Sequence, residues 1–483
     1  MSYLGIDLGT SGLRALLVDA AGTPVAAAER AYTVSNPAPG WSEQDPADWI
    51  AALDEAVEEL RARAPAFADL RGIGVAGHMH GATLLDAEAR VLRPCILWND
   101  TRAAAEAARL DVIPGMRETS GNIVFPGFTA PKLDWVRTHE PDIFARTARV
   151  LLPAAFLTHY LTGDFVADMS DSAGTAWLDV RARGWSDALL SAGHMTAAQM
   201  PRLVEGCAPA GALREALRRK WGLGREVVVA GGAGDNAAAA CGIGVLGEGD
   251  GFVSLGTSGV ILMARDRYAP APETAVHTFC HAVPDRWYQM GVMLSATDSL
   301  NWLSRVTGAT PKELTAGLGP DLHAPGPVRF LPYLSGERTP HNDAHVRGGF
   351  TGLATGTTRA DLTRAVLEGV AFGLRDLAEA LNSAGARADA LTAIGGGAAS
   401  EYWLRLVATV LGVPLRVPEG REFGAALGAA RLGRIAATRA RPEDVITGPA
   451  IARTVTPEPG QLVAFDEAYD AFRNAYRGLK DIQ

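Results

Sequence analysis

The sequence predicts an α/β protein made of two similar halves, and a repeated pentapeptide is the first of three observations behind this prediction. Leu-Gly-Thr-Ser-Gly occurs at 8–12 and again at 255–259, each time between two short apolar segments, as a turn between strands would. Late in each half, an apolar segment runs into glycines and then a helical pattern, at 227–236 and 390–400. The length of 483 residues allows two to three domains. We therefore expect a duplicated domain whose two turns face one cleft.

Local patterns place the first elements and the boundary. Strands are expected at 3–6, 13–18 and 24–32, followed by a helix that Asp45 caps and that has Pro46 in its first position. A glycine-rich and acidic stretch at 244–250 is suited to a hinge. The predicted domains are residues 1–246 and 247–483. A helix is also expected at 461–483, where apolar residues recur at 4-3-4-3 spacing.

The composition excludes several functional classes. A net charge of −9 argues against a nucleic-acid surface, which needs clustered Lys and Arg. The four cysteines form no CxxC pair, which fits a reducing cytosol. No apolar run approaches the ~18 residues of a membrane span, and the N-terminus shows no export signal. We expect a cytoplasmic protein that binds neither nucleic acid nor membrane.

The two repeated turns are candidate phosphate sites. A Thr-Ser pair between glycines presents backbone N–H groups and hydroxyls, and glycine allows phosphate oxygens to approach closely. Thr10 and Ser11 form this pair in the first turn. Asp7 precedes the first turn, whereas Ser254 holds the equivalent place before the second. Only the first half therefore brings a carboxylate to the phosphates, as a Mg²⁺-dependent site would need.

Asp235 is the candidate general base. It follows a glycine run at a strand end, where a helix begins, so its carboxylate can face a cleft. A carboxylate there could accept a hydroxyl proton during phosphoryl transfer. The alternative is that Asp235 is simply the N-cap of the helix. Asn236 favours the functional reading, because an amide suits polyol hydroxyls.

Other nucleotide and metal motifs are absent or weak. The chain has no GxxxxGK[ST], HRD or DFG motif. Residues 232–237 fit the loose GxGxx[GA] pattern, but the acidic residue expected about 20 positions later is missing. His80 follows a buried strand and is either a core histidine or a site residue. The short His and Cys clusters lack the spacing of a structural zinc site.

With these motifs in hand, the whole chain, roughly residues 3–480, resembles the FGGY family of carbohydrate kinases. Two long family signatures match, at 127–139 and at 348–368. Shorter strings resemble the members that phosphorylate D-xylulose rather than those acting on glycerol, gluconate or ribulose. These strings are 40–46, 79–83, 96–100, 168–171, 330–341 and 424–431. His78 departs from the pattern, because those members often carry Gln there.

The resemblance implies two actin-like (ribonuclease H-like) domains around a cleft, with sugar on the N-terminal side and ATP on the C-terminal side. It implies ATP-dependent phosphorylation of D-xylulose to D-xylulose 5-phosphate, with Mg²⁺ required. The sequence does not give the oligomeric state, and a homodimer is one assembly open to it. By this likeness, Asp235 is the proton acceptor and Asp7 places Mg²⁺ and the phosphates. The implied sugar contacts are Met79, His80, Asp235 and Asn236. The implied nucleotide contacts are Thr10, Ser11, Gly256, Thr257, Gly396, Gly397 and Ala398.

Two alternatives stay open at this point. Within the enzyme class, the chain could be a kinase for another ketose or for a polyol, because His78 lies next to the implied sugar contacts. From a different class, it could be an actin-like ATPase that does not act on sugar. ADP release that depends on sugar distinguishes the enzyme from this ATPase.

Overall fold

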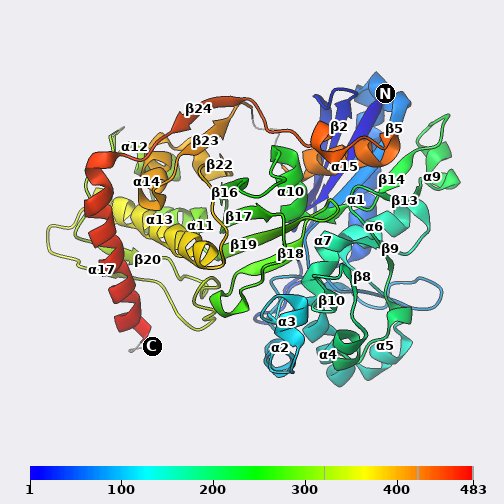
Figure 1. Cartoon of the computed structure of the whole chain (residues 1–483), viewed down its shortest axis with the longest axis horizontal. Coiled ribbons are helices and arrows are strands. Elements are labelled where there is room, and N and C mark those ends of the chain that lie inside the picture. The colour runs from blue at the N-terminus through cyan, green and yellow to red at the C-terminus, as the bar shows by residue number, and fades with distance from the viewer. Residues whose placement is uncertain (320, 421–423, 481–483) are drawn as a thin grey trace.

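Two large mixed sheets organise the chain in a computed structural model that describes residues 1–319, 321–420 and 424–480 (Figure 1). The first sheet has the order β13-β14-β5-β1-β2-β3, and β15 pairs with the end of β5. Its strands are β1 (Ser2–Leu8), β2 (Gly12–Asp19), β3 (Pro24–Ala31), β5 (Leu70–Gly77), β13 (Pro209–Ala212), β14 (Val228–Ala230) and β15 (Ala233–Gly234). The three strands expected near the N-terminus are therefore confirmed.

The second sheet repeats this plan and has the order β18-β19-β17-β16-β22-β23-β24. Its strands are β16 (Gly251–Leu255), β17 (Gly259–Arg265), β18 (His277–Cys280), β19 (Trp287–Met293), β22 (Leu391–Ile394), β23 (Leu415–Pro418) and β24 (Ile451–Val455). β1 pairs antiparallel with β2 and parallel with β5, and β16 pairs in the same way with β17 and β22. The predicted duplication is confirmed, and both pentapeptides form the turns of these hairpins.

Helices cover the sheets and join the two halves. They are α1 (Pro46–Arg63), α2 (Ala104–Asp111), α3 (Met116–Ser120), α4 (Thr129–His139), α5 (Pro141–Arg146), α6 (Pro153–Thr162), α7 (Met169–Ser172), α8 (Asp187–Ala192), α9 (Glu215–Lys220), α10 (Asp235–Ile243), α11 (Thr297–Thr307), α12 (Pro311–Ala316), α13 (Arg359–Ser383), α14 (Glu401–Leu411), α15 (Ala425–Thr438), α16 (Pro442–Val445) and α17 (Leu462–Lys480). Asp45 caps α1 by accepting a hydrogen bond from the Ala47 N–H, as expected. In α17, Phe465, Tyr469 and Phe472 are buried along the predicted stripe.

Two-stranded ribbons and short 3-10 turns complete the structure outside the main sheets. The ribbon strands are β4 (Glu43–Gln44), β6 (Thr83–Leu85), β7 (Cys95–Ile96), β8 (Arg149–Leu151), β9 (Val166–Asp168), β10 (Leu178–Asp179), β11 (Gly184–Trp185), β12 (Arg202–Val204), β20 (Arg329–Leu331) and β21 (Gly349–Thr351). The 3-10 turns are η1 (Pro65–Asp69), η2 (Ala173–Thr175), η3 (Ala197–Gln199), η4 (Pro272–Thr274), η5 (Gly396–Ala399) and η6 (Pro459–Gln461).

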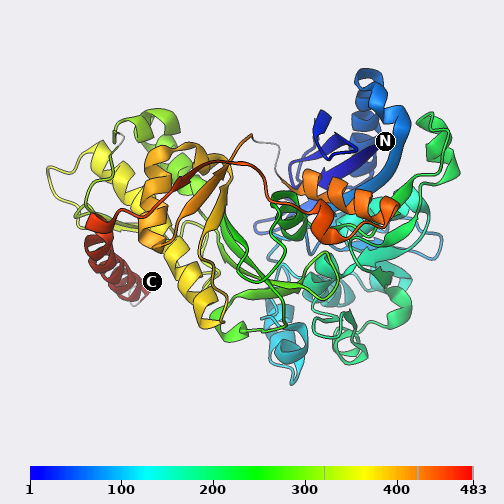
Figure 2. The same ribbon diagram turned by 45° about the horizontal axis from the view of Figure 1, so that its top comes forward.

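Helix α15 comes from the second half but packs on the first sheet, as Figures 1 and 2 show. Glycines on the sheet make this contact close: a β carbon on Gly5 would lie 1.8 Å from the Ala426 carbonyl oxygen, and one on Gly74 would lie 1.9 Å from that of Ala429. The chain thus crosses back between the halves after residue 418. The boundary predicted near residue 246 stays a prediction, and the end of the predicted second domain, 481–483, lies outside the described residues.

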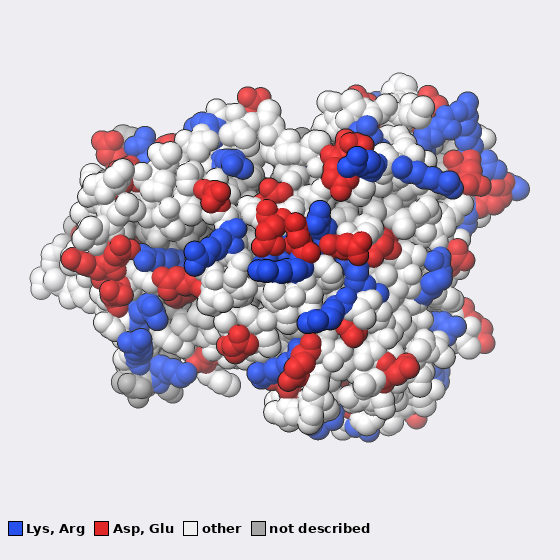
Figure 3. All heavy atoms as spheres, viewed as in Figure 1, with Lys and Arg blue, Asp and Glu red and all other residues white. Residues whose placement is uncertain are grey.

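The surface carries both signs of charge. On the face in Figure 3, acidic and basic side chains alternate across the two halves. In the described part of the chain, no helix is both long and apolar enough to cross a membrane.

Candidate active site

Three strand ends bring the predicted sugar-side residues to one edge of the first sheet. β1 and β15 both pair in parallel with β5, so Asp7 lies opposite Ala76, and Ala76 lies opposite Ala233. Met79 and His80 follow β5, and Asp235 follows β15. Because carboxyl ends of parallel strands share an edge, these four residues lie together, with the Met79–His80 pair leaving the strand between the two acids.

Asp235 is the first residue of α10, and Gly234 is its N-cap. The N-cap alternative for Asp235 is therefore wrong, since its side chain instead accepts hydrogen bonds from Asn236, from the backbone N–H at 2.7 Å and the side-chain amide at 2.9 Å. Burial raises the pKa of Asp235 to about 6, and the bonds from Asn236 oppose this rise. The carboxylate is fixed, ionised at neutral pH and more basic than an ordinary aspartate, as proton transfer requires.

Asp7 is the second acid at this edge. Burial raises the pKa of Asp7 to about 7, with a further rise from nearby Asp235 and an opposing effect from Arg14 across the hairpin. The Tyr32 hydroxyl lies close by and donates a hydrogen bond of 2.6 Å to the Gly9 carbonyl oxygen. A partly buried carboxyl group whose pKa is raised in this way is stabilised in its charged form when a cation binds to it.

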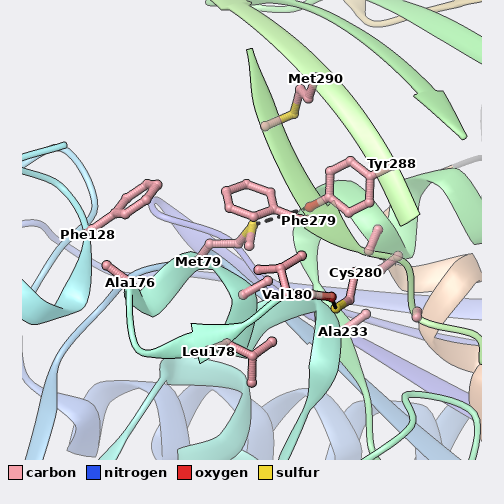
Figure 4. Packing of buried hydrophobic residues seen from close by; sticks show 14 of the residues in the cluster. Met79, Phe128, Ala176, Leu178, Val180, Ala233, Phe279, Cys280, Tyr288 and Met290 are labelled. Atoms are coloured by element: carbon pink, nitrogen blue, oxygen red, sulfur yellow. Dashed lines mark hydrogen bonds between the residues drawn. The ribbon is translucent and has the colours of Figure 1, made fainter. Parts of the chain in front are cut away.

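Met79 and His80 are held by residues from both halves. His80 has a left-handed backbone (φ 69°), and its Nδ1 lies 2.7 Å from the Gly174 carbonyl oxygen. Its ring stacks on Phe128, with the ring centres 4.6 Å apart. The hydroxyl of Tyr288 on β19 donates a hydrogen bond of 3.8 Å to the Met79 sulfur, as Figure 4 shows. The second half thus supplies one wall of the region around the predicted sugar contacts.

Lys132 fixes the loop that carries His80. Its ammonium group is fully buried and donates to the carbonyl oxygens of His80 (2.7 Å) and Gly127 (2.6 Å). Burial lowers the pKa of Lys132 to about 7. The family signature at 127–139 therefore contributes to the site through loop geometry.

His78 lies next to this pair in sequence but occupies the core. Its ring packs edge-on against Trp49 of α1 at 5.6 Å, and neither nitrogen has a partner among the described residues. Burial lowers the pKa of His78 to about 3. The His78 side chain therefore packs in the core, where it meets Trp49.

The first hairpin turn is anchored from outside the sheet. The Trp98 indole N–H donates to the Thr10 hydroxyl at 3.0 Å, and the Gln44 amide donates to the Thr10 carbonyl oxygen at 2.6 Å. Ser11 is exposed at the tip. The turn is therefore held rigid while its tip stays open.

The second turn meets the other predicted nucleotide residues. Gly256 accepts from the backbone N–H (2.9 Å) and the hydroxyl (2.8 Å) of Thr297, and Thr257 is exposed. Gly396, Gly397 and Ala398 form η5 directly after β22, which is parallel to β16. The structure thus brings these five predicted residues together at one edge of the second sheet.

Sequence reasoning missed the turn that supports Asp235. The Gly234 N–H donates to the Ser170 hydroxyl at 3.1 Å, and that hydroxyl donates to Asp168 at 2.5 Å. Asp171 follows, with both carboxyl oxygens buried and without a partner in the described part of the chain. The string 168–171 was noticed only as a point of resemblance, because no local pattern shows that it meets residue 234. Tyr288, on a distant strand, gave no sequence signal.

The donor set fits a magnesium ion bound largely by phosphate. In the described ranges no group of three or more His, Cys, Asp and Glu side chains could hold a metal on its own. Mg²⁺ typically uses one or two carboxylates together with substrate phosphates and water. Asp7, a partly buried acid beside a phosphate-suited turn, has the chemistry that such a site needs.

Comparison with known proteins agrees with this arrangement. The model for the FGGY family of carbohydrate kinases, N-terminal domain, matches residues 2–242, and that for the C-terminal domain matches residues 251–437. A xylulose kinase from Escherichia coli (strain K12) is 46% identical over 484 residues, covering 99% of each chain.

Solved structures extend the similarity to the whole fold. A xyloylose kinase from Brucella ovis is 58% identical with a TM-score of 0.98, covering 100% of both chains. A xylulose kinase from Rhodospirillum rubrum is 29% identical with a TM-score of 0.91, covering 100% of this chain and 99% of that one. The two sheets have the actin-like arrangement of such kinases. The chain therefore belongs to the FGGY family of carbohydrate kinases.

Proposed function

We propose that this protein is a xylulokinase, which transfers the γ-phosphoryl group of ATP to D-xylulose and forms D-xylulose 5-phosphate and ADP. The observation that carries the proposal is the position of two acids, Asp7 and Asp235, at one sheet edge with Met79 and His80 leaving the strand between them. The xylulose kinases among its relatives support the choice of sugar.

In this proposal the sugar lies against Met79, His80 and Asn236, with its primary hydroxyl at Asp235. The hydroxyl oxygen forms a bond to the γ-phosphorus while the bond to ADP breaks, and the hydroxyl proton moves to Asp235. Backbone N–H groups of the two hairpin turns stabilise charge on the phosphoryl oxygens. Mg²⁺, held by Asp7 and the phosphates, would neutralise further charge there.

The nucleotide would lie along the second sheet. Gly256 and Thr257 would contact its phosphates, and Gly396, Gly397 and Ala398 would border the adenosine. Thr10 and Ser11 would approach the transferred group from the first hairpin. The open tips of both turns and the glycine-rich η5 support this placement, because close approach to a ligand needs an uncovered backbone.

One experiment tests the function: ADP release measured with a panel of pentuloses, hexuloses and polyols. We expect a preference for D-xylulose. Preference for another sugar would reassign the substrate within the family, as the other-ketose alternative predicts. ADP release that no sugar increases would favour the actin-like ATPase instead.

Two further expectations remain proposals. We infer a cytoplasmic enzyme that binds a small sugar and neither nucleic acid nor membrane, and a homodimer is one assembly consistent with the family. Sedimentation velocity at several protein concentrations tests the oligomeric state.

A further inference from the structure

We propose that Asp171 is a further sugar-binding residue, whose carboxyl group bonds a hydroxyl of the substrate beside Asp235. This inference rests on the function proposed above. It assigns a contact to the 168–171 turn, which the family resemblance left without a role.

The first step is the position of the turn. α7 lies against β15, and the Ser170 hydroxyl accepts the Gly234 N–H at 3.1 Å. Asp168 accepts the backbone N–H groups of Ser170 (2.7 Å) and Asp171 (3.0 Å). The backbone of Asp171 is thus fixed next to the residue that precedes Asp235.

The second step is the state of the Asp171 side chain. It is 1% exposed, and neither carboxyl oxygen has a hydrogen-bond partner among the residues described. The charged groups that act on it are Asp168 and Asp235, and both are acids. Burial and these two acids raise the pKa of Asp171 well above its ordinary value, and no described protein group meets the hydrogen-bonding sites of its carboxyl group.

The third step is what surrounds this group. Burial and the nearby carboxyl groups of Asp235, Asp171 and Asp168 raise the pKa of Tyr288 well above its ordinary value. The Tyr288 hydroxyl also contacts the Met79 sulfur. One turn beyond Asp171, Gly174 holds the His80 ring through its carbonyl oxygen. Asp171 therefore lies near Asp235 and near the groups that contact Met79 and His80.

A buried carboxyl group without partners destabilises the folded protein, because nothing replaces the hydrogen bonds that it made to water. A sugar hydroxyl both donates and accepts, so it can satisfy a buried carboxyl group that has no protein partner. A purely structural acid would instead be bonded to its neighbours, as Asp168 is. This contrast within one turn favours a ligand-binding role for Asp171.

The test compares Asp171→Leu and Asp171→Asn with the wild type by steady-state kinetics, calorimetric sugar binding and thermal unfolding. For Asp171→Leu we expect KM for D-xylulose to rise about tenfold or more, the loss of about one hydrogen bond, with KM for ATP within about twofold. Its Tm should be equal or higher, because an unpaired buried acid is removed. The Asn side chain of Asp171→Asn can still donate and accept hydrogen bonds, so its KM for D-xylulose should lie between those of the wild type and Asp171→Leu.

The matched control is Asp376→Asn in the second half, a buried acid that accepts a 2.6 Å hydrogen bond from Tyr469. It should leave sugar affinity unchanged. Wild-type sugar affinity in a folded Asp171→Leu protein would overturn the inference. If that variant does not fold, unchanged affinity in Asp171→Asn overturns it equally. A wild type that neither binds nor phosphorylates D-xylulose would instead refute the proposed function, and the inference with it.

Discussion

Gly428 of α15 lies directly against Ala238 of α10, so that a β carbon on Gly428 would be 1.7 Å from the Ala238 carbonyl oxygen. The contact is reciprocal, since a β carbon on Gly242 would lie 2.4 Å from the Gly424 carbonyl oxygen. The Arg431 guanidinium caps this crossing by donating to the carbonyl oxygens of Cys241 (2.7 Å) and Gly242 (3.1 Å). Helix α10 begins with Asp235, so the crossing connects the proposed catalytic base to the second half of the chain.

We predict that Gly428→Ala destabilises the protein by about 3 kcal/mol and lowers turnover, because the added methyl group forces α10 and α15 apart. Chemical denaturation and steady-state kinetics measure the two effects. Gly478→Ala in α17 is the matched control, because its β carbon would meet nothing within 4 Å. This control should be neutral or stabilised by about 0.5–1 kcal/mol, as for an ordinary helical glycine. Equal behaviour of the two variants would show that the close crossing is not needed.

Local sequence signals predicted the hairpins, the start of α1 and the buried stripe of α17, because each depends on neighbouring residues. They also placed Asp7 and Asp235 at strand ends, which predicts that both residues lie at the same edge of the sheet. The position of α15 on the first sheet could not be predicted in this way. A helical pattern shows which residues are buried but not which sheet covers them, and the glycines at 5, 72 and 74 are informative only once the sheet is known.

The same limit applies to the site. Tyr288 reaches Met79 from a strand more than two hundred positions later in the chain, and Ser170 meets Gly234 across sixty-four positions. Such contacts arise from tertiary packing and leave no periodic or spacing signal. Asn236 is a second example. The sequence predicted that its amide meets the sugar, and the structure shows that this amide also donates a hydrogen bond to Asp235, which no sequence pattern predicted.

For the proposed base, we predict that Asp235→Ala lowers kcat by roughly 10²–10⁴-fold, the usual contribution of a general base. Sugar binding should change much less, since Met79 and His80 remain in place. Asp187→Ala is the control, because Asp187 is likewise the first residue of a helix, α8, but belongs to none of the proposed contacts. Single-turnover phosphoryl transfer gives the chemical rate directly. A wild-type rate in Asp235→Ala would remove this residue from the mechanism.

Asp7→Asn should raise the Mg²⁺ concentration needed for half-maximal turnover while leaving sugar affinity nearly unchanged. The physical reason is that the amide keeps the size of the side chain but loses the charge that would hold the cation. Titration of activity with Mg²⁺ at saturating ATP measures this. Ser254→Ala, at the equivalent place in the second hairpin, is the comparison and should shift the Mg²⁺ requirement less. Identical Mg²⁺ curves for Asp7→Asn and the wild type would contradict a metal role for Asp7.

His78→Gln should make stability less sensitive to acid. In the unfolded chain the pKa of His78 is near 6.5, whereas burial lowers it to about 3 in the folded protein. Between these pH values His78 binds a proton in the unfolded chain but not in the folded protein. The contribution of His78 to the free energy of unfolding therefore decreases as the pH falls. The free energy of unfolding of the wild type relative to His78→Gln should therefore be constant above pH 6.5. Below it, this difference should fall by up to about 1.4 kcal/mol per pH unit.

Taking the difference between the two proteins is essential, because acids such as Asp7 and Glu337, whose pKa values are raised to about 7 and about 8, shift the absolute stability in the opposite direction. These effects cancel when the two proteins are unfolded in urea at the same series of pH values. Sugar affinity measured on the same samples should be alike, because His78 packs against Trp49. A pH-independent difference would mean that His78 has the same pKa in the folded and unfolded protein. A large change in sugar preference would place His78 in contact with the substrate.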